Sequence, residues 1–171
     1  MSTGLLILRI VLGLVMAAHG AQKLFGWFGG GGLSGTAGMF GQLRFRAPQL
    51  MALIAGLSEL GGGFLLAAGL LTPLAAVALT GVMLVAIISA HWSNGFWATN
   101  GGYEYNLVIL TAAIAITITG PGAYSLDALA GWNDALCGPW SGVGALALAT
   151  LSAAATLTLG RRPATTSEPV G

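Results

Sequence analysis

The stretch LMALIAGLSELGGGFLLAAGLL, residues 50–71, decides the fold of this chain. It is long enough to cross the hydrocarbon core of a bilayer, which takes about 20 apolar residues. Its only charged side chain, Glu59, lies near the centre, where a charge costs roughly 2.5–3.5 kcal/mol on insertion scales. Three glycines, residues 61–63, follow almost at once. The stretch therefore predicts a membrane helix, and it raises the question of what the carboxylate faces.

The composition of the whole chain is that of a membrane protein. Of its 171 residues, 56% are hydrophobic and 6% are charged, whereas soluble domains carry about 25% charged residues. The formal net charge of +1 gives no reason to expect a nucleic acid partner. The single cysteine, Cys137, excludes an internal disulfide and any paired-cysteine redox or zinc motif.

Five segments are predicted to span the membrane as helices, because lipid offers no partner to unpaired backbone groups. They are residues 4–26, 49–71, 73–91, 105–121 and 142–160. The first has no basic region before it and contains Arg9, so we expect a retained helix and not a signal peptide. Residues 33–45, LSGTAGMFGQLRF, are expected to form a short amphipathic helix on the membrane surface. The predicted fold class is all-α, a polytopic membrane helix bundle.

The distribution of basic residues over the two sides predicts the orientation of the bundle. With five spans, the connections after the first and third segments share one side with the C-terminal tail. That side holds Lys23, Arg44, Arg46, Arg161 and Arg162. The positive-inside rule then places the N-terminus outside and the C-terminus in the cytoplasm.

The glycines after Glu59 indicate where its side chain points. Gly62 and Gly63 stand three and four residues further on and so share its helical face. Small residues let membrane helices approach closely, which predicts that Glu59 faces a neighbouring helix and not lipid. Two interpretations remain open: a protonated Glu59 fixed by hydrogen bonds within the bundle, or a functional carboxylate that faces a cavity or a cofactor.

Several polar residues are predicted to gather at one end of the bundle, with Glu59 deeper below. His19 and Lys23 share a face of the first segment, while His91 ends the third segment and Glu104 precedes the fourth. We expect Lys23 to pair with Glu104 at this end. At the opposite end, Arg9 and Asp127 form the second expected ion pair. Both pairs have an alternative interpretation, in which they only fasten helix ends.

Two histidines in a membrane bundle also raise the question of haem. His19 and His91 are expected near the same face, which is compatible with bis-histidine ligation. Each histidine also has a structural interpretation, His19 as a donor to a backbone carbonyl and His91 as an interface residue. We predict neither a haem nor a metal site.

Six stretches, taken in order and with their spacing, resemble the DoxX family of small bacterial integral membrane proteins over roughly residues 5–132. They are RIVLGL (9–14), HGAQKLFG (19–26), ELGGGFLLAAGLLTPLAA (59–76), NGFW (94–97), GGYEYNL (101–107) and GPGAYSLD (120–127). The resemblance implies a four-helix transmembrane core, here residues 1–140. Residues 141–160 are then an extra transmembrane helix, and residues 161–171 a polar basic tail.

The resemblance implies a place in the bacterial inner membrane, in contact with lipid and with other membrane or membrane-associated subunits. The family name comes from proteins similar to the small subunit of a thiosulfate:quinone oxidoreductase. We therefore expect an accessory or anchoring subunit of a quinone-linked redox complex that is not catalytic alone. One alternative is direct quinone binding, in which Glu59, His19 and Lys23 handle protons and a partner supplies the electrons. Another is a purely structural assembly subunit.

Overall fold

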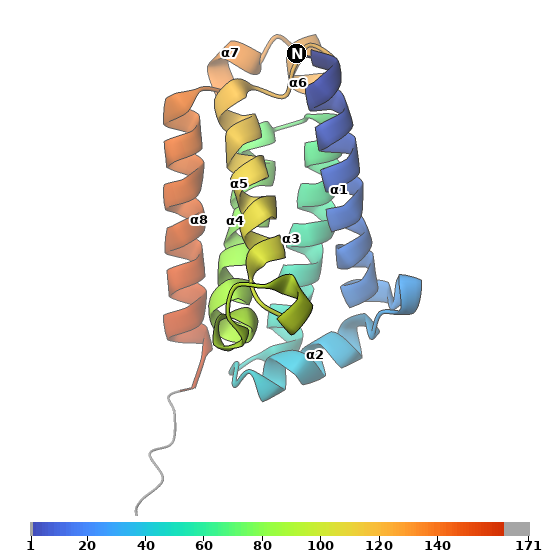
Figure 1. The fold of residues 1–171 in the computed structure, drawn as a ribbon, viewed down its shortest axis with the longest axis vertical. Helices are drawn as coiled ribbons and strands as arrows, with labels where there is room; N and C mark the ends of the chain where they lie inside the picture. Colours follow the sequence, from blue (N-terminus) through green and yellow to red (C-terminus); the bar gives the residue numbers. More distant parts are fainter. Residues whose placement is uncertain (1, 163–171) are drawn as a thin grey trace, which may run out of the picture.

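The computed structural model describes residues 2–162 and confirms the predicted all-α bundle (Figure 1). Five helices run roughly along its long axis: α1 (Ser2–Phe25), α3 (Pro48–Ala68), α4 (Thr72–Ala86), α5 (Glu104–Thr119) and α8 (Pro139–Gly160). By length and composition, α1, α3, the segment Thr72–Asn94 and α8 are candidate membrane spans, and α5 is a shorter apolar helix of 16 residues. Large apolar side chains such as Val108, Leu148 and Leu151 face outwards, where lipid would cover them.

The ends of the long helices follow local sequence signals. Proline stands in the first turn of α3, α4 and α8, where its missing N–H group has no helical partner to lose. Glycine ends two of the helices: Gly69 after α3 has φ 62°, and Gly120 after α5 has φ 81°. The predicted fourth span therefore stops two residues earlier than expected.

The connections lie at the two ends of the bundle. At one end, α2 (Gly32–Gln42) crosses below the long helices, where the surface helix was predicted (Figure 1). The other connections contain short helices: η1 (Trp27–Gly29), η3 (Trp92–Asn94), η4 (Ala98–Asn100), α6 (Leu126–Leu129) and α7 (Asn133–Leu136). The α4–α5 connection lies at the same end as α2, and α6 and α7 lie at the opposite end with the N-terminus (Figure 1).

Two kinds of packing hold the bundle. Helices α1 and α3 approach through glycines: a Cβ at Gly63 would stand 2.5 Å from the Gly13 carbonyl oxygen and 2.5 Å from the Ala17 nitrogen. Helix α4 is central and packs against α3, α5 and α8. Helices α4, α5 and α8 meet through contacts lined by alanines, among them Ala76, Ala113 and Ala145.

Helix α4 does not run regularly to its end. Its last turn, Ile87–His91, is a π-helix (η2), and the Ser89 hydroxyl donates a hydrogen bond of 2.6 Å to the carbonyl oxygen of Val85. A side chain that competes for the carbonyl of the preceding turn disturbs the regular ladder. Single π-turns occur frequently at functional sites, so this end of α4 is a candidate location for one.

The end of α8 is tied to the connection between α2 and α3. Phe45 and Arg161 form an isolated antiparallel bridge, and the Arg161 Nε donates to the Leu43 carbonyl oxygen at 3.2 Å. The amide of Arg162 donates to the Arg44 carbonyl oxygen at 2.9 Å. Beyond Arg162, the predicted polar tail lies outside the described residues.

Candidate functional site

The centre of the candidate site is an ion pair between α1 and α3. Lys23 Nζ donates to Glu59 Oε1, and the side chains are 26% and 2% exposed. Glu59 thus points into the bundle towards the first helix, because the glycine contacts bring α1 and α3 close together. Its second oxygen, Oε2, is buried and has no hydrogen-bond partner. Lys23 thus supplies the counter-charge of the buried carboxylate through one oxygen and leaves the second oxygen without a hydrogen bond.

The other polar residues predicted for this end lie around the pair but do not join it. His19 is half-buried, and its ring centroid lies 6.2 Å from that of Tyr105. His91 Nδ1 donates to the Gly101 carbonyl oxygen at 2.7 Å, since a carbonyl can only accept. The predicted Lys23–Glu104 pair is wrong: Glu104 Oε2 accepts the amide hydrogen of Ala98 at 3.0 Å, inside its own loop, and Lys23 takes the deeper acid.

The two glycines predicted to pack beside Glu59 have different partners. Gly63 faces α1, as expected. Gly62 faces α4, where an added Cβ would stand 3.2 Å from the side chain of Leu79 and 3.3 Å from that of Ala78. Neighbouring positions on a helix are turned by about 100°, so one glycine of the motif serves each neighbouring helix.

Arg9 and Asp127 meet at one corner of the bundle, but they do not form the direct ion pair expected from the sequence. Both side chains are fully buried. Arg9 donates to the carbonyl oxygens of Ala67, at 3.0 Å, and Tyr124. Asp127 accepts from the amides of Leu71 and Thr72, at 2.8 and 3.0 Å, and from the Thr72 hydroxyl at 2.7 Å. Arg9 therefore joins α1 to the end of α3 and to the segment before α6, and Asp127 joins α6 to the start of α4.

We expect Asp127→Ala to lower the free energy of unfolding by about 2 kcal/mol, because it leaves three donors at the start of α4 without their acceptor. Thermal melting in detergent measures the change. Asp134→Ala, which removes an exposed acid in the same connection, is the matched control and should melt with the unaltered protein. Equal melting temperatures for the two variants would show that the Asp127 contacts do not stabilise the corner.

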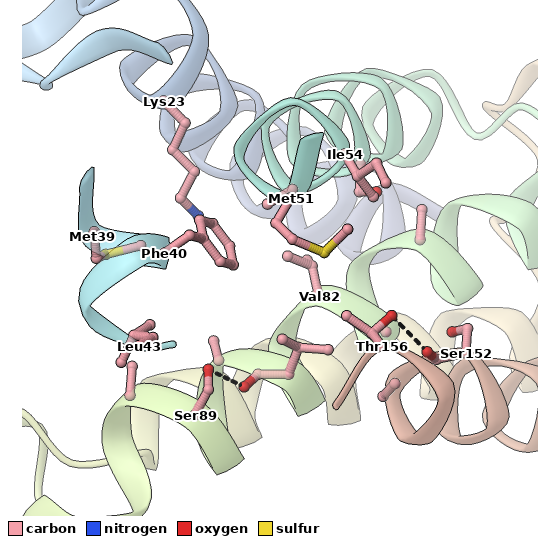
Figure 2. A pocket seen from close by; sticks show the side chains of 18 of the residues that line it. Lys23, Met39, Phe40, Leu43, Met51, Ile54, Val82, Ser89, Ser152 and Thr156 are labelled. Carbon is pink, nitrogen blue, oxygen red and sulfur yellow. Dashed lines mark hydrogen bonds between the residues drawn. The ribbon is translucent and has the colours of Figure 1, made fainter. Parts of the chain in front are cut away.

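A cavity of about 470 Å³ lies beside the ion pair (Figure 2). Most of its wall is apolar and comes from α2, α3 and α4, with Phe40, Met51 and Val82 among the contributors. Polar groups enter at separate points: Lys23 from α1, Ser58 from α3, Ser89 and His91 from the π-turn, and Ser152 and Thr156 from α8. The volume falls within the roughly 300–1,000 Å³ range of small-molecule pockets.

The distribution of ligand-type side chains does not describe a metal centre. Within residues 2–162, no three His, Cys, Asp or Glu side chains come together as a possible metal site. The half-buried Cys137 lies at the opposite end of the bundle, between α7 and α8. The candidate site consists of the Lys23–Glu59 ion pair beside the apolar cavity.

The fold and site together define an integral membrane protein with a polytopic helix bundle and a buried polar site. The chain belongs to the DoxX family, whose model, described as DoxX, matches residues 4–92. This match contains α1 to η2, and with them both members of the Lys23–Glu59 pair.

Three curated relatives are similar over most of the chain. The chain is 30% identical over 124 residues to the protein named "Putative oxidoreductase CatD" of Bacillus subtilis (strain 168), covering 72% of this chain and 84% of that protein. It is 31% identical to "Inner membrane protein YphA" and 29% identical to "Inner membrane protein YqjF", both of Escherichia coli (strain K12). These two alignments cover 72% and 74% of this chain, and 87% and 91% of the respective relatives. No solved structure matches the chain significantly.

Sequence reasoning missed the cavity and the partners of Asp127. The sequence could have predicted that the hydroxyls of Ser152 and Thr156 share a helical face, because the two residues stand four positions apart. The packing of the helices was needed to show that this face of α8 is directed towards α4 and the π-turn. For Asp127, Thr72 and Pro73 mark a helix start, but no local signal links that start to an acid 55 residues away.

Proposed function

We propose that this chain is an accessory subunit that anchors a quinone-linked redox enzyme to the bacterial inner membrane and contributes a buried polar site to the complex. The chain does not catalyse alone in this proposal. The observation that carries it is the Lys23–Glu59 pair, placed beside a cavity within a membrane bundle. A relative whose name includes "oxidoreductase" and two relatives named inner membrane proteins agree with it.

The pair supports a role beyond fastening helices. A buried ion pair contributes little net stability compared with apolar side chains of similar volume, and α1 and α3 already pack closely through glycines. Small-molecule sites combine an apolar wall with a few polar or charged groups, and the Lys23 ammonium of the pair lies in the wall of the cavity. Proton exchange with a quinone-linked partner is a role that a carboxylate such as that of Glu59 can perform, and the imidazole of His19, one turn before Lys23 on α1, is a second group of the required type.

The test combines purification with one substitution. Purification of the full chain in mild detergent should recover a redox enzyme as a co-purifying partner. Glu59→Gln keeps the shape of the side chain and removes its titration, so the complex should assemble but lose at least about tenfold in quinone-linked turnover. Asp134→Asn, at an exposed acid, is the control and should keep full turnover. Normal turnover with Glu59→Gln would make the pair structural, and recovery of no redox enzyme would refute the accessory role.

The same proposal includes an orientation, with the N-terminus outside and the C-terminus in the cytoplasm. Its basis is that Lys23, Arg46 and Arg161 gather at the α2 end of the bundle, whereas Asp134 lies at the other. In a Cys137→Ser background, an impermeant maleimide added to intact cells should label Asp134→Cys but not Arg46→Cys. Labelling of position 46 alone would reverse the orientation.

The native Cys137 should react far more slowly than an exposed thiol. Burial and the nearby Asp127 charge raise the pKa of the Cys137 thiol to about 11. The thiolate is the reactive form, so at pH 7.5 we expect labelling of the purified unaltered protein to be about 300-fold slower than labelling of Asp134→Cys. The rate should rise about tenfold per pH unit up to that pKa. A rate that levels off near pH 8.5 would show an unperturbed thiol.

A further inference from the structure

We propose that the cavity between α2, α3, α4 and α8 binds a neutral, membrane-soluble molecule whose head carries a hydrogen-bond-accepting carbonyl group. The head would lie at the Lys23 side and the apolar body would run towards α8. This deepens the proposed function, and the choice of a quinone as the particular member of this chemical class rests on it.

The cavity has the shape and lining of a small-molecule site. Its wall joins side chains from α2, such as Phe40, to side chains from α3 and α4, such as Met51 and Val82 (Figure 2). The π-turn contributes three successive residues, Ser89 to His91. An apolar wall with a few polar groups at fixed points is the usual character of a small-molecule site, and the irregular turn of α4 faces into it.

The charges beside the cavity limit which ligands it can bind. Lys23 is the charged side chain in the wall, and its ammonium is already paired with Glu59 behind it. The pair is neutral as a whole, so an anionic head would leave a net negative charge in an apolar site, and a cationic head would meet the ammonium. Both arrangements are costly because unpaired charges are poorly tolerated away from water. The site therefore favours a ligand without net charge.

Hydrogen-bond donors are distributed unevenly over the wall of the cavity. The hydroxyls of Ser89, Ser152 and Thr156 donate to backbone carbonyl oxygens of their own helices, at 2.6, 2.9 and 2.8 Å. They present oxygen lone pairs to the cavity. The Lys23 ammonium has three hydrogens and gives one to Glu59. Of the hydroxyl and ammonium groups of the wall, the Lys23 ammonium and the Ser58 hydroxyl of α3 therefore keep donor hydrogens that can match a carbonyl oxygen of the ligand.

The far wall of the cavity is built by α8, which lies beyond residues 4–92 that match the family model. Helix α8 contributes Ser152, Ala153 and Thr156. Small and hydroxylated side chains at these positions leave room that larger ones would fill. The last helix thereby sets the length of the apolar body that the cavity accepts.

The test uses the full chain in lipid nanodiscs and an azido-substituted decylubiquinone as a photoreactive probe. Crosslinks should map to peptides that contain residues 39–58, 77–91 and 152–156. Unlabelled decylubiquinone should compete at concentrations at least about tenfold lower than dodecanoate, an anion, or dodecylamine, a cation. Ala86→Phe, which fills the cavity, should reduce labelling at least about tenfold. Ala147→Phe, on the outward face of α8, should leave labelling within about twofold.

Each outcome decides the inference. Labelling spread evenly over outward-facing residues, or equal labelling of the Ala86→Phe and Ala147→Phe variants, would overturn it, as would stronger competition by dodecanoate. If Ala86→Phe does not fold, Thr156→Phe fills the same cavity from α8 and must give the same loss. Cavity labelling without a co-purifying redox enzyme would keep this inference and refute the proposed function. If a redox enzyme co-purified and Glu59→Gln lost turnover, but the cavity was not labelled, the proposed function would stand and this inference would be refuted.

Discussion

Alanine at position 63 is expected to lower the free energy of unfolding by about 3 kcal/mol, whereas alanine at position 61, two residues earlier, should leave it unchanged or raise it by up to about 1 kcal/mol. The two substitutions add the same methyl group to the same helix. They differ in what the methyl group meets. At Gly63 it would stand 2.5 Å from backbone atoms of Gly13 and Ala17, and at Gly61 it would meet nothing within 4 Å.

The size of the effect follows from the rigidity of the contact. A flexible side chain can move aside, but the backbone of α1 can give way only if the helix shifts. Such a shift would also pull Lys23 away from Glu59, since these residues lie on the same two helices. Gly62→Ala is the intermediate case, because its methyl group would meet the side chains of Leu79 and Ala78 at 3.2 and 3.3 Å. We expect a loss of about 1 kcal/mol there.

Unfolding of the three variants in an SDS titration, followed by tryptophan fluorescence, measures these differences. The expected order of stability is Gly61→Ala first, then Gly62→Ala, then Gly63→Ala. A loss of about 3 kcal/mol corresponds to a melting temperature lowered by roughly 10 °C in a chain of this size. If Gly61→Ala and Gly63→Ala melted together, close approach of α1 and α3 would not depend on this glycine.

The sequence predicted the helices well because each carries its own signal. Length and hydrophobicity mark the spans, and proline or glycine marks most of their ends. The last helix illustrates this: its segment was expected at 142–160, and α8 begins three residues earlier at Pro139. The π-turn at Ile87–His91 was not predicted, because it depends on how Ser89 competes for the Val85 carbonyl.

The candidate site was predictable only in part. Glu59 and its glycines lie within one helix, so helical periodicity could assign them a common face. The choice between Glu59 and Glu104 as the partner of Lys23 depends on the relative positions of α1, α3 and α5 along the bundle axis. Helical periodicity gives no information on these positions. The structure places Glu104 in a hydrogen bond with the Ala98 amide and leaves Glu59 for Lys23. Long-range choices of this kind need the packing of the bundle.

Lys23→Met is expected to lower the free energy of unfolding by about 3–5 kcal/mol, because it leaves the buried Glu59 carboxylate without its counter-charge. The double variant Lys23→Met/Glu59→Met should recover most of that loss, since apolar side chains of similar size replace both charges. Arg46→Met, which removes an exposed cation from the same end of the bundle, is the matched control and should change stability by less than about 0.5 kcal/mol.

A double-mutant cycle on Lys23 and Glu59 measures the coupling directly. It uses the two single methionine variants, the double variant and the unaltered protein, each unfolded in SDS. The double variant also separates stability from function, because it is expected to fold while lacking both the ammonium and the carboxylate. If the pair serves a ligand, this well-folded variant should lose quinone labelling and quinone-linked turnover together. If the double variant retained both quinone labelling and quinone-linked turnover, the only role of the two charges would be to hold α1 against α3, and the functional polar site would lie elsewhere in the bundle.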